Sequence, residues 1–292
     1  MRKVRVVVAQ IAPRLGEVQA NLEQHLEVVQ QAREARADVL VFPELSLTGY
    51  ELRDQVADCA PDCGPAVQRL AEASKDLDLV VGYVDESPAH KFYNAAAYLS
   101  GGEVRHVHHK VYLPTYGMFD EGRYFARGDV LRTFDTGYAP AGMLICEDVW
   151  HPTSAWLMAQ QGASILFVPS SGPTRGARPG EVTSVEVWHE LLSVTAQFQT
   201  AWVVYCNRVG GEDGLIFGGG SIVIDPFGRT VAEIEPLAEG LLVAELDGEV
   251  LRRARTAYPL LRDADVELIY RELGRVRRAR FDLPGEDPEP SA

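Results

Sequence analysis

Three residues with complementary chemistry, Glu44, Lys110 and Cys146, each follow closely on a short apolar run of the sequence. A thiol can act as a nucleophile, a carboxylate can take and return its proton, and an ammonium can stabilise an oxyanion. Brought to one place, these groups would attack the carbon atom of an amide-like bond, and this chemistry needs neither a metal nor an organic cofactor. We therefore predict that the three residues share one cavity, with no cofactor and no metal.

Each of the three residues also has a simpler explanation when it is taken alone. Cys146 could end a buried strand as an ordinary core residue, because free cysteines are commonly buried. If a helix starts just after it, backbone N–H groups of that turn would instead favour its thiolate. Glu44 could lie on a surface loop, or in a partly desolvated pocket that raises its pKa. Lys110 could be the solvated end of a strand, so the prediction of a catalytic site depends on the combination of the three.

The apolar runs before these residues are typical of β-strands, which alternate with amphipathic helices along the chain. We expect strands at 4–9, 39–42, 79–84, 95–99, 104–108, 143–146, 165–168, 202–205, 221–224, 230–234 and 241–245. We expect helices at about 21–35, 65–74, from 150 onward, and from a capping box at 183–186 to about 198. Because Gly101 and Gly102 predict a hairpin that interrupts this alternation, the pattern favours a layered α/β sandwich with mixed sheets.

No break in composition marks a linker, so we predict one domain over residues 1–262 and a C-terminal extension over 263–292. The tail beyond Asp282 is rich in Pro and Glu and is expected to be disordered. The chain has 28 Lys and Arg against 42 Asp and Glu, for a formal charge of −14. This acidity argues against nucleic acid or an anionic membrane as a partner, because both select basic surfaces.

The sequence also bears on the compartment in which the protein works. No apolar run reaches the length of a membrane-spanning helix. The apolar run at the N-terminus stops at Gln10, which is short for the apolar region of a signal peptide. We therefore expect a cytoplasmic protein, where a reducing environment suits a free thiol nucleophile.

Three other clusters, of Cys, His and Gly residues, are explained better by structure than by function. Cys59 and Cys63 could form a zinc half-site or a redox pair, but no second ligand pair follows, so we expect two loop thiols. The histidines at 106, 108 and 109 could suggest a metal, but they alternate across a strand, and an exposed strand face explains them better. The glycine run at 218–220 precedes a strand rather than a helix, so it indicates a turn or close packing rather than a phosphate site.

Taken together, the three reactive segments resemble the Glu–Lys–Cys signatures of the nitrilase, or carbon–nitrogen hydrolase, superfamily, in the order that this family uses. The resemblance covers the chain from about Val4 to Glu245. A more specific likeness, to the glutamine-hydrolysing domain of glutamine-dependent NAD synthetases, rests on 110–125, 145–150 and 204–213. Because the chain ends without room for a synthetase domain, we expect a stand-alone hydrolase.

This resemblance implies a four-layer αββα sandwich that pairs with another copy through its helices. It implies that Cys146 is the nucleophile and Glu44 the general base. Lys110 then stabilises the tetrahedral oxyanion together with the backbone N–H of Glu147, and Glu121 helps to orient the lysine and the substrate. A base with a pKa of about 7 would serve both halves of the reaction best, so we expect Glu44 beside apolar or acidic groups.

Substrate-binding residues are predicted from the same resemblance. Tyr116 and Glu147 match substrate-side positions of the synthetase branch. The loop at 169–180 departs from that branch, and its Ser170, Ser171 and Arg175 are candidates to bind a substrate carboxylate or amide. The alternative for Arg175, and for Arg178, is a solvated loop charge, and glutamine specificity stays open.

The expected function is therefore hydrolysis of a non-peptide carbon–nitrogen bond, with release of ammonia from a small carboxamide such as a glutamine-like molecule. Hydrolysis of a nitrile or of an N-carbamoyl amine is an alternative within the superfamily, because each passes through a covalent intermediate on the cysteine. A further alternative is an ammonia-supplying subunit of a separate synthetase. We expect a homodimer or higher homo-oligomer, a small-molecule substrate, and neither nucleic acid nor membrane as partner.

Overall fold

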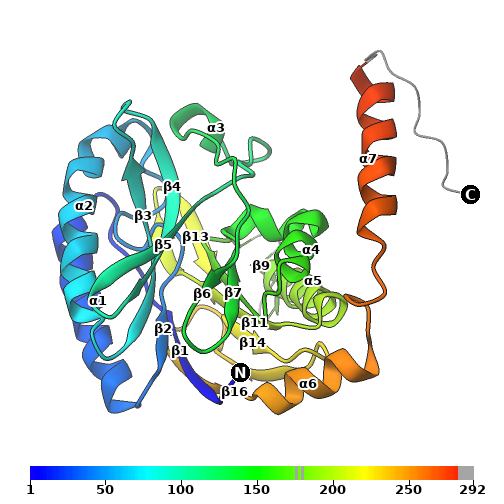
Figure 1. Ribbon diagram of the computed structural model, residues 1–292. Helices are drawn as coiled ribbons and strands as arrows, with labels where there is room; N and C mark the ends of the chain where they lie inside the picture. Colours follow the sequence, from blue (N-terminus) through cyan, green and yellow to red (C-terminus); the bar gives the residue numbers. More distant parts are fainter. Residues whose placement is uncertain (175–176, 179–180, 282–292) are drawn as a thin grey trace, which may run out of the picture.

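The computed structural model describes residues 1–174, 177–178 and 181–281 (Figure 1). In spatial order, the first six-stranded sheet contains β16 (Gly240–Leu246), β1 (Val4–Gln10), β2 (Val39–Val41), β3 (Asp78–Glu86), β4 (Phe92–Ser100) and β5 (Glu103–His109). The second contains β15 (Thr230–Glu233), β14 (Ile222–Ile224), β11 (Trp202–Asn207), β8 (Ile165–Ser170), β7 (Pro140–Met143) and β6 (Phe134–Asp135). Two small pairs lie outside these sheets: β9 (Ala177–Arg178) with β10 (Glu181–Val182), and β12 (Val209–Glu212) with β13 (Leu215–Gly218).

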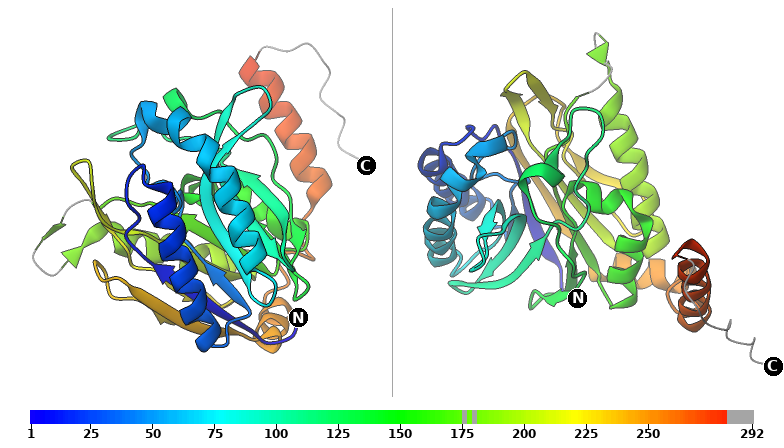
Figure 2. Two further views of the ribbon diagram at one scale, coloured as in Figure 1. Left: turned by 90° about the vertical axis from the view of Figure 1, so that its left-hand side faces the viewer. Right: turned by 90° about the horizontal axis from the view of Figure 1, so that it is seen from above.

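Helices cover the outer face of each sheet. The first sheet is covered by α1 (Val18–Glu34) and α2 (Val56–Ala73), and the second by α4 (Pro152–Gln160) and α5 (Thr183–Gln199) (Figure 2). The remaining helical segments are η1 (Arg53–Gln55), α3 (Glu121–Tyr124), η2 (Cys146–Trp150), α6 (Gly248–Ala257) and α7 (Val266–Phe281). The predicted four-layer αββα sandwich with mixed sheets is thus confirmed.

Three separate hydrophobic cores hold these four layers together. Along β1, Val7 and Ala9 pack into the core under α1 and α2, whereas Val6 and Val8 pack into the core between the two sheets. A third core lies between the second sheet and α4 and α5. Because successive strand residues point to opposite faces, a sheet that is covered on both sides is apolar at nearly every position, as the run in β1 is.

The strand directions bring the three reactive residues to the same end of the sandwich, at the carboxyl ends of their strands. β1, β2 and β3 run parallel, and β5 is parallel to β3 because both are antiparallel to β4. β7, β8 and β11 also run parallel to one another. Glu44 follows β2, Lys110 follows β5, and Cys146 follows β7. Two of the reactive residues are therefore supplied by the first sheet and one by the second.

The predicted strands and the helices α1, α4 and α5 are confirmed to within a few residues at their ends, but two elements differ. Helix α2 begins at Val56 rather than at residue 65, although it contains Pro61 and Pro65, which lack the N–H donor of a helix interior. Its apolar face outweighs that loss, since Cys59 and Cys63 are both buried on it. The prediction of two loop thiols was therefore wrong: these cysteines are core residues one helical turn apart.

The strand predicted to reach Cys146 ends instead at Met143, and Cys146 opens the short helix η2. The hairpin predicted at Gly101 and Gly102 is confirmed between β4 and β5. The predicted close packing of the glycine run is also confirmed, because a Cβ on Gly220 would lie 2.5 Å from the Val185 side chain. In the part of the chain that the structure describes, we find no helix that combines the length and the apolar character needed to cross a membrane.

Candidate active site

Glu44 lies in a turn that passes unusually close to the neighbouring strand. After β2, the turn at Pro43 and Glu44 crosses Gly82 of β3, where an added Cβ would lie 2.4 Å from the Pro43 carbonyl oxygen. Only glycine leaves room for this crossing. The turn carries the Glu44 carboxylate from the end of the strand into the interior, where the residue is 1% exposed.

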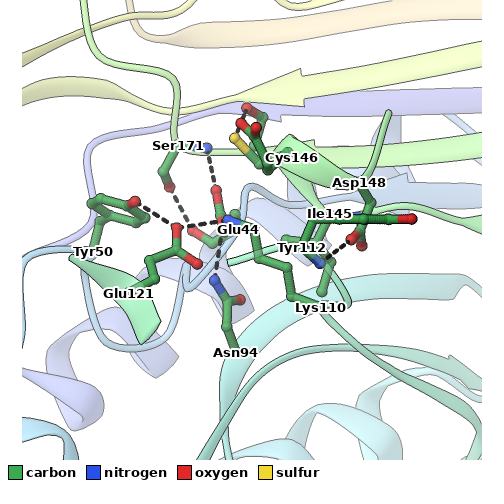
Figure 3. Close-up of polar contacts among 12 residues, drawn as sticks. Glu44, Tyr50, Asn94, Lys110, Tyr112, Glu121, Ile145, Cys146, Asp148 and Ser171 are labelled. Atoms are coloured by element: carbon green, nitrogen blue, oxygen red, sulfur yellow. Dashed lines mark hydrogen bonds and ion pairs between the residues drawn. The ribbon is translucent and has the colours of Figure 1, made fainter. Parts of the chain in front are cut away.

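The Glu44 carboxylate, Lys110 and Glu121 form a buried ionic cluster (Figure 3). Lys110 is fully buried, and its Nζ donates to Glu44 Oε1 at 2.6 Å and to Glu121 Oε1 at 2.7 Å. Asn94 Nδ2 donates to Glu44 Oε1 at 2.8 Å, and the hydroxyl of Tyr50 donates to Glu121 Oε1 at 2.6 Å. The predicted convergence of Glu44 and Lys110 is therefore direct, and Glu121 joins them.

Cys146 lies beside this cluster, as Figure 3 shows. Ser170 Oγ donates to its Sγ at 3.2 Å. The backbone of Cys146 has a φ of 46°, in the left-handed region that non-glycine residues seldom adopt. Such a conformation costs free energy, and residues that keep it are concentrated at functional sites. Here it turns the chain sharply from β7 into η2.

A pocket of about 390 Å³ opens above Cys146. The side chains on its walls are mostly apolar or aromatic, with the carboxylate of Glu147 among them. The pocket is lined by Pro114, Tyr116, Phe119, Cys146, Glu147, Trp150, Gly172, Pro173, Ser184, Val187 and Trp188. The hydroxyl of Tyr116 donates to Glu147 Oε2 at 2.9 Å, which fixes both predicted substrate-side residues at the pocket. Cys146 thus lines the pocket, whereas Lys110 is not among the lining residues and is fully buried beside it.

Asp148 ties the lysine segment to the cysteine turn. Its fully buried carboxylate accepts hydrogen bonds from the backbone N–H groups of Val111 and Tyr112, both at 2.9 Å, and of Ile145 at 3.0 Å. Nε2 of the buried His108 lies 2.8 Å from the same carboxylate. Since these partners flank Lys110 and Cys146, Asp148 fixes the distance between the end of β5 and the start of η2.

We expect Asp148→Ala to lower the free energy of unfolding by at least about 3 kcal/mol, because it leaves several buried N–H donors without an acceptor. Urea unfolding followed by circular dichroism measures this loss. Asp225→Ala is a matched control, since Asp225 also accepts from two backbone N–H groups but in a solvent-accessible turn. Water can replace it there, and we expect a loss below about 1 kcal/mol. Equal losses in the two variants would contradict the role of Asp148.

Burial and the charges of the cluster together set the protonation states of Lys110, Glu121 and Cys146. Burial by itself lowers the pKa of Lys110, but the carboxylates of Glu121 and Glu44 raise it well above its usual value, so the ammonium stays charged. Burial raises the pKa of Glu121 to about 7, against the opposing effect of Lys110. Burial also raises the pKa of the Cys146 thiol, and the charge of Glu44 raises it further.

The thiol of Cys146 is therefore neutral at rest. The prediction that N–H groups of the turn favour a thiolate was wrong. The desolvation of the sulfur and the nearby Glu44 charge outweigh the attraction of Lys110. A neutral thiol needs a base at the moment of attack, and the carboxylate that raises its pKa is the candidate.

Comparison with known proteins identifies the family. A family model described as carbon-nitrogen hydrolase matches residues 5–256. The chain belongs to the carbon–nitrogen hydrolase family. It is 34% identical over 253 residues to the glutamine-dependent NAD(+) synthetase of Thermotoga maritima, covering 85% of this chain and 42% of that protein. The similar protein of Acinetobacter baylyi is 30% identical over 254 residues, covering 86% and 46%. The chain thus spans less than half the length of these two relatives.

Solved structures agree with this assignment. The glutamine-dependent NAD+ synthetase of Acinetobacter baumannii superposes with a TM-score of 0.78 at 32% identity, over 86% of this chain and 47% of that one. A variant of the Nesterenkonia AN1 amidase from the nitrilase superfamily gives a TM-score of 0.78 at 26% identity, over 91% and 96%. The carbon–nitrogen hydrolase fold is therefore shared over nearly the full length of the latter protein.

Two of the remaining predicted residues of this carbon–nitrogen hydrolase lie beside the cluster. Ser170 and Ser171 are buried and contact catalytic candidates: Ser170 Oγ donates to Cys146 Sγ at 3.2 Å, and the N–H of Ser171 donates to Glu44 Oε2 at 2.7 Å. Their predicted role in binding substrate stays a prediction. Arg175 lies outside the described residues, and so does the side chain of Arg178.

The histidine strand was partly misinterpreted from the sequence. His108 does not lie on an exposed face: it is buried against Asp148, because β5 turns this side toward the second sheet. His106 stacks on Phe134, and burial lowers its pKa to about 4. Among the described residues, no group of three or more His, Cys, Asp or Glu side chains is arranged to hold a metal ion.

Four residues that support the site were missed: Tyr50, Asn94, His108 and Asp148. Asn94 had a signal, because asparagine is disfavoured within strands and sits here in β4 beside apolar residues. Asp148 stands two residues after Cys146 and, with Glu147, interrupts an apolar run from Met143 to Trp150, which also marks it. The hydroxyl of Tyr50 reaches Glu121 from a loop far away in the sequence, and no local pattern indicates such a contact.

Proposed function

We propose that this chain hydrolyses the carboxamide group of a small molecule and releases ammonia through a thioester on Cys146. The observation that carries the proposal is the juxtaposition of a cysteine that lines the pocket with a buried carboxylate and a buried ammonium. In the proposed reaction, Glu44 takes the proton of the thiol as the sulfur attacks the carbonyl carbon. Glu44 then returns the proton to the departing ammonia.

Lys110 is proposed to stabilise the negative charge that develops on the carbonyl oxygen. Its ammonium has three N–H donors, and within the described part of the chain two of them go to Glu44 and Glu121. The third, with the backbone N–H of Glu147, can serve the oxyanion. Removal of one such donor typically costs on the order of 3 kcal/mol of transition-state stabilisation. Water activated by Glu44 completes the cycle by hydrolysing the thioester.

The structural relative among the amidases supports the covalent step. In one variant of the Nesterenkonia amidase, the acetamide moiety of fluoroacetamide is added covalently at the active site cysteine. That adduct shows the cysteine of that amidase to be a nucleophile, and we propose the same nucleophilic role for Cys146. The relatives that are NAD(+) synthetases favour a second candidate function, in which this chain supplies ammonia from a glutamine-like amide to a separate synthetase.

An ammonia-release assay on the purified chain tests the proposal. The panel contains short aliphatic amides, glutamine, N-carbamoyl amines and nitriles, with Cys146→Ala as the blank. Turnover of an amide by the unmodified chain but not by the Cys146→Ala blank would support the proposed amidase activity. Turnover confined to nitriles or to N-carbamoyl amines would replace it by one of these alternatives. No turnover by the chain alone, with glutamine hydrolysis restored by a synthetase, would favour the ammonia-supplying subunit.

We expect the activity to depend on the ionisation of Glu121. Because the pKa of Glu121 is raised to about 7, this carboxyl is neutral below that pH and charged above it. The charged form holds Lys110 more firmly, so kcat/KM should rise about tenfold per pH unit below pH 7 and level off above. In Glu121→Gln this rise of kcat/KM with pH should vanish, leaving a lower activity that depends less on pH. An unchanged rise in that variant would assign the titration to another group.

A further inference from the structure

A buried ion pair that the proposed mechanism does not use lies where β11 leads into β12. Arg208 follows β11, Glu212 ends β12, and the Arg208 guanidinium donates to Glu212 Oε2 through Nη1. Both side chains are almost wholly buried. Because burying two charges costs free energy that their attraction often fails to offset, a buried ion pair is weak evidence for stability. The other contacts of this pair indicate what it holds in place.

The Arg208 half of the pair is fixed at three points. Its Nη2 donates to the carbonyl oxygen of Pro13 at 3.1 Å, and its guanidinium carbon lies 4.2 Å from the centre of the Phe217 ring. Its backbone N–H donates to the carbonyl oxygen of Ser170 at 3.3 Å, and the Ser170 hydroxyl contacts Cys146. The guanidinium is therefore fixed relative to the part of the second sheet that lies beside the cysteine.

The Glu212 half of the pair holds a loop that belongs to the first sheet. Glu212 Oε1 accepts hydrogen bonds from the backbone N–H groups of Tyr50 at 2.7 Å and of Glu51 at 2.6 Å. These two residues follow the turn that carries Glu44, and they lie in neither a helix nor a strand. Because their N–H groups have no place in a helix or a sheet, they need an acceptor from elsewhere. Glu212 supplies it, and its negative charge strengthens both bonds.

Tyr50 connects this loop to the ionic cluster of the active site. Its hydroxyl donates to Glu121 Oε1 at 2.6 Å, and its ring meets Phe217 edge-on, with 5.9 Å between the ring centres. The same oxygen of Glu121 accepts from Lys110 Nζ at 2.7 Å. The position of the Tyr50 loop therefore determines how the Glu121 carboxyl faces the ammonium.

Several groups act on the charge of Glu121. Burial raises its pKa to about 7, Lys110 opposes that rise, the charge of Glu44 adds to it, and the hydrogen bond from Tyr50 opposes it. A cavity of about 200 Å³ adjoins the same carboxyl, and its lining includes the charged residues Glu51, Arg53 and Asp120. The Tyr50 hydroxyl is thus the contact through which the loop acts on Glu121.

We propose that Arg208 and Glu212 are positioning residues of the active site, which hold Tyr50 so that its hydroxyl fixes the Glu121 carboxyl against Lys110. Neither residue is among the described residues that line the pocket at Cys146, so both act through Tyr50 rather than on the substrate. The kinetic test of this role rests on the proposed amide hydrolysis, whereas a direct titration of Glu121 does not.

Tyr50→Phe tests the contact with Glu121, because it removes the hydroxyl and keeps the ring. A hydrogen bond donated to a carboxylate favours its charged form, so Glu121 should titrate about one pH unit higher in this variant. ¹³C NMR of the full chain labelled at the glutamate side-chain carboxyls measures the titration, and Glu121→Gln identifies the signal. The rise of kcat/KM with pH should move equally, giving about tenfold lower kcat/KM at pH 6 and a nearly normal value at pH 9.

Glu212→Asp tests the positioning step, because it keeps the charge opposite Arg208 but draws the carboxylate back from the loop. We expect the Glu121 titration to move in the same direction as in Tyr50→Phe. In Tyr50→Phe/Glu212→Asp it should move no further than in Tyr50→Phe alone, since Glu212 acts through the hydroxyl. Arg208→Lys keeps a cation but gives up the fork that reaches both Glu212 and Pro13, so it should cause a smaller movement in the same direction.

Asp213→Asn is the matched control, because it removes the exposed contact of Asp213 with Arg53 in the same hairpin and leaves the Tyr50 loop bound to Glu212. The Glu121 titration should stay in place in this control. If Glu212→Asp does not fold, Arg208→Lys decides the question.

A Glu121 titration that stays in place in the folded Glu212→Asp and Arg208→Lys variants would overturn the proposal, since the pair would then serve stability alone. Movements that add in the double variant would overturn it too, because Glu212 would then act by another route. Failure of the amidase proposal looks different: the unmodified chain would turn over no amide, while the NMR titration would still respond to Tyr50→Phe and Glu212→Asp.

Discussion

Cys146→Ala is expected to reduce ammonia release by at least about 10⁴-fold while the protein stays folded, because the described pocket lining offers no other thiol to form the acyl intermediate. The loss should appear in kcat, with substrate binding retained, since the alanine leaves the pocket walls in place. Steady-state kinetics and binding of the intact amide by calorimetry measure the two quantities. Mass spectrometry of the unmodified enzyme, quenched during turnover, should show the acyl adduct on the peptide that contains Cys146.

Cys206→Ala is the matched control for the nucleophile. Cys206 is fully buried, and its thiol donates to the carbonyl oxygens of Ala9 and Val41, each at 3.3 Å, between the two sheets. Its removal should lower stability through a small cavity and leave kcat within about threefold of normal. Substantial amide turnover by Cys146→Ala, or an acyl group found on another residue, would end the proposed mechanism.

Lys110→Met is expected to damage both stability and catalysis. It leaves Glu44 and Glu121 buried side by side without a cation, and removal of one partner from a buried ion pair costs about 3–5 kcal/mol. The cost should be smaller at pH 5 than at pH 8, because Glu121, whose pKa is already raised to about 7, then takes up a proton. Loss of the oxyanion donor should lower kcat by at least about 10²-fold.

A double substitution separates the two effects of Lys110. In Lys110→Met/Glu121→Gln the repulsion between the carboxylates is gone, so urea unfolding at pH 8 should recover part of the lost stability, whereas kcat should not recover. Lys75→Met, which removes an exposed lysine at the end of α2, should change stability by less than about 0.5 kcal/mol. Recovery of kcat in the double variant would show that Lys110 acts only by balancing charge.

The larger strands and the helices α1, α4 and α5 could be predicted because the central strands are covered on both faces and are therefore apolar at almost every position, whereas α6, α7 and the short strands such as β12 and β13 were not predicted. Glu44, Lys110 and Cys146 could be predicted as a group because each lies near the end of a predicted strand and their segments together resemble the Glu–Lys–Cys signatures of the superfamily. The inward direction of His108 and the course of α2 through two prolines could not, since both depend on packing between segments distant in the chain. The supporting contacts of Asp148 and Tyr50 were missed for the same reason.

The division of the reactive residues between the two sheets has a consequence for how activity is acquired. Glu44 and Lys110 are delivered by the first sheet and Cys146 by the second, and Asp148 joins them only across the inner core. A refolding chain with just one sheet assembled would hold a sulfhydryl without a proton acceptor, or an acceptor without a sulfhydryl. Under the proposed mechanism, such intermediates would not turn over an amide. After dilution from denaturant, activity should therefore recover more slowly than secondary structure. Its rate should report the docking of the two sheets.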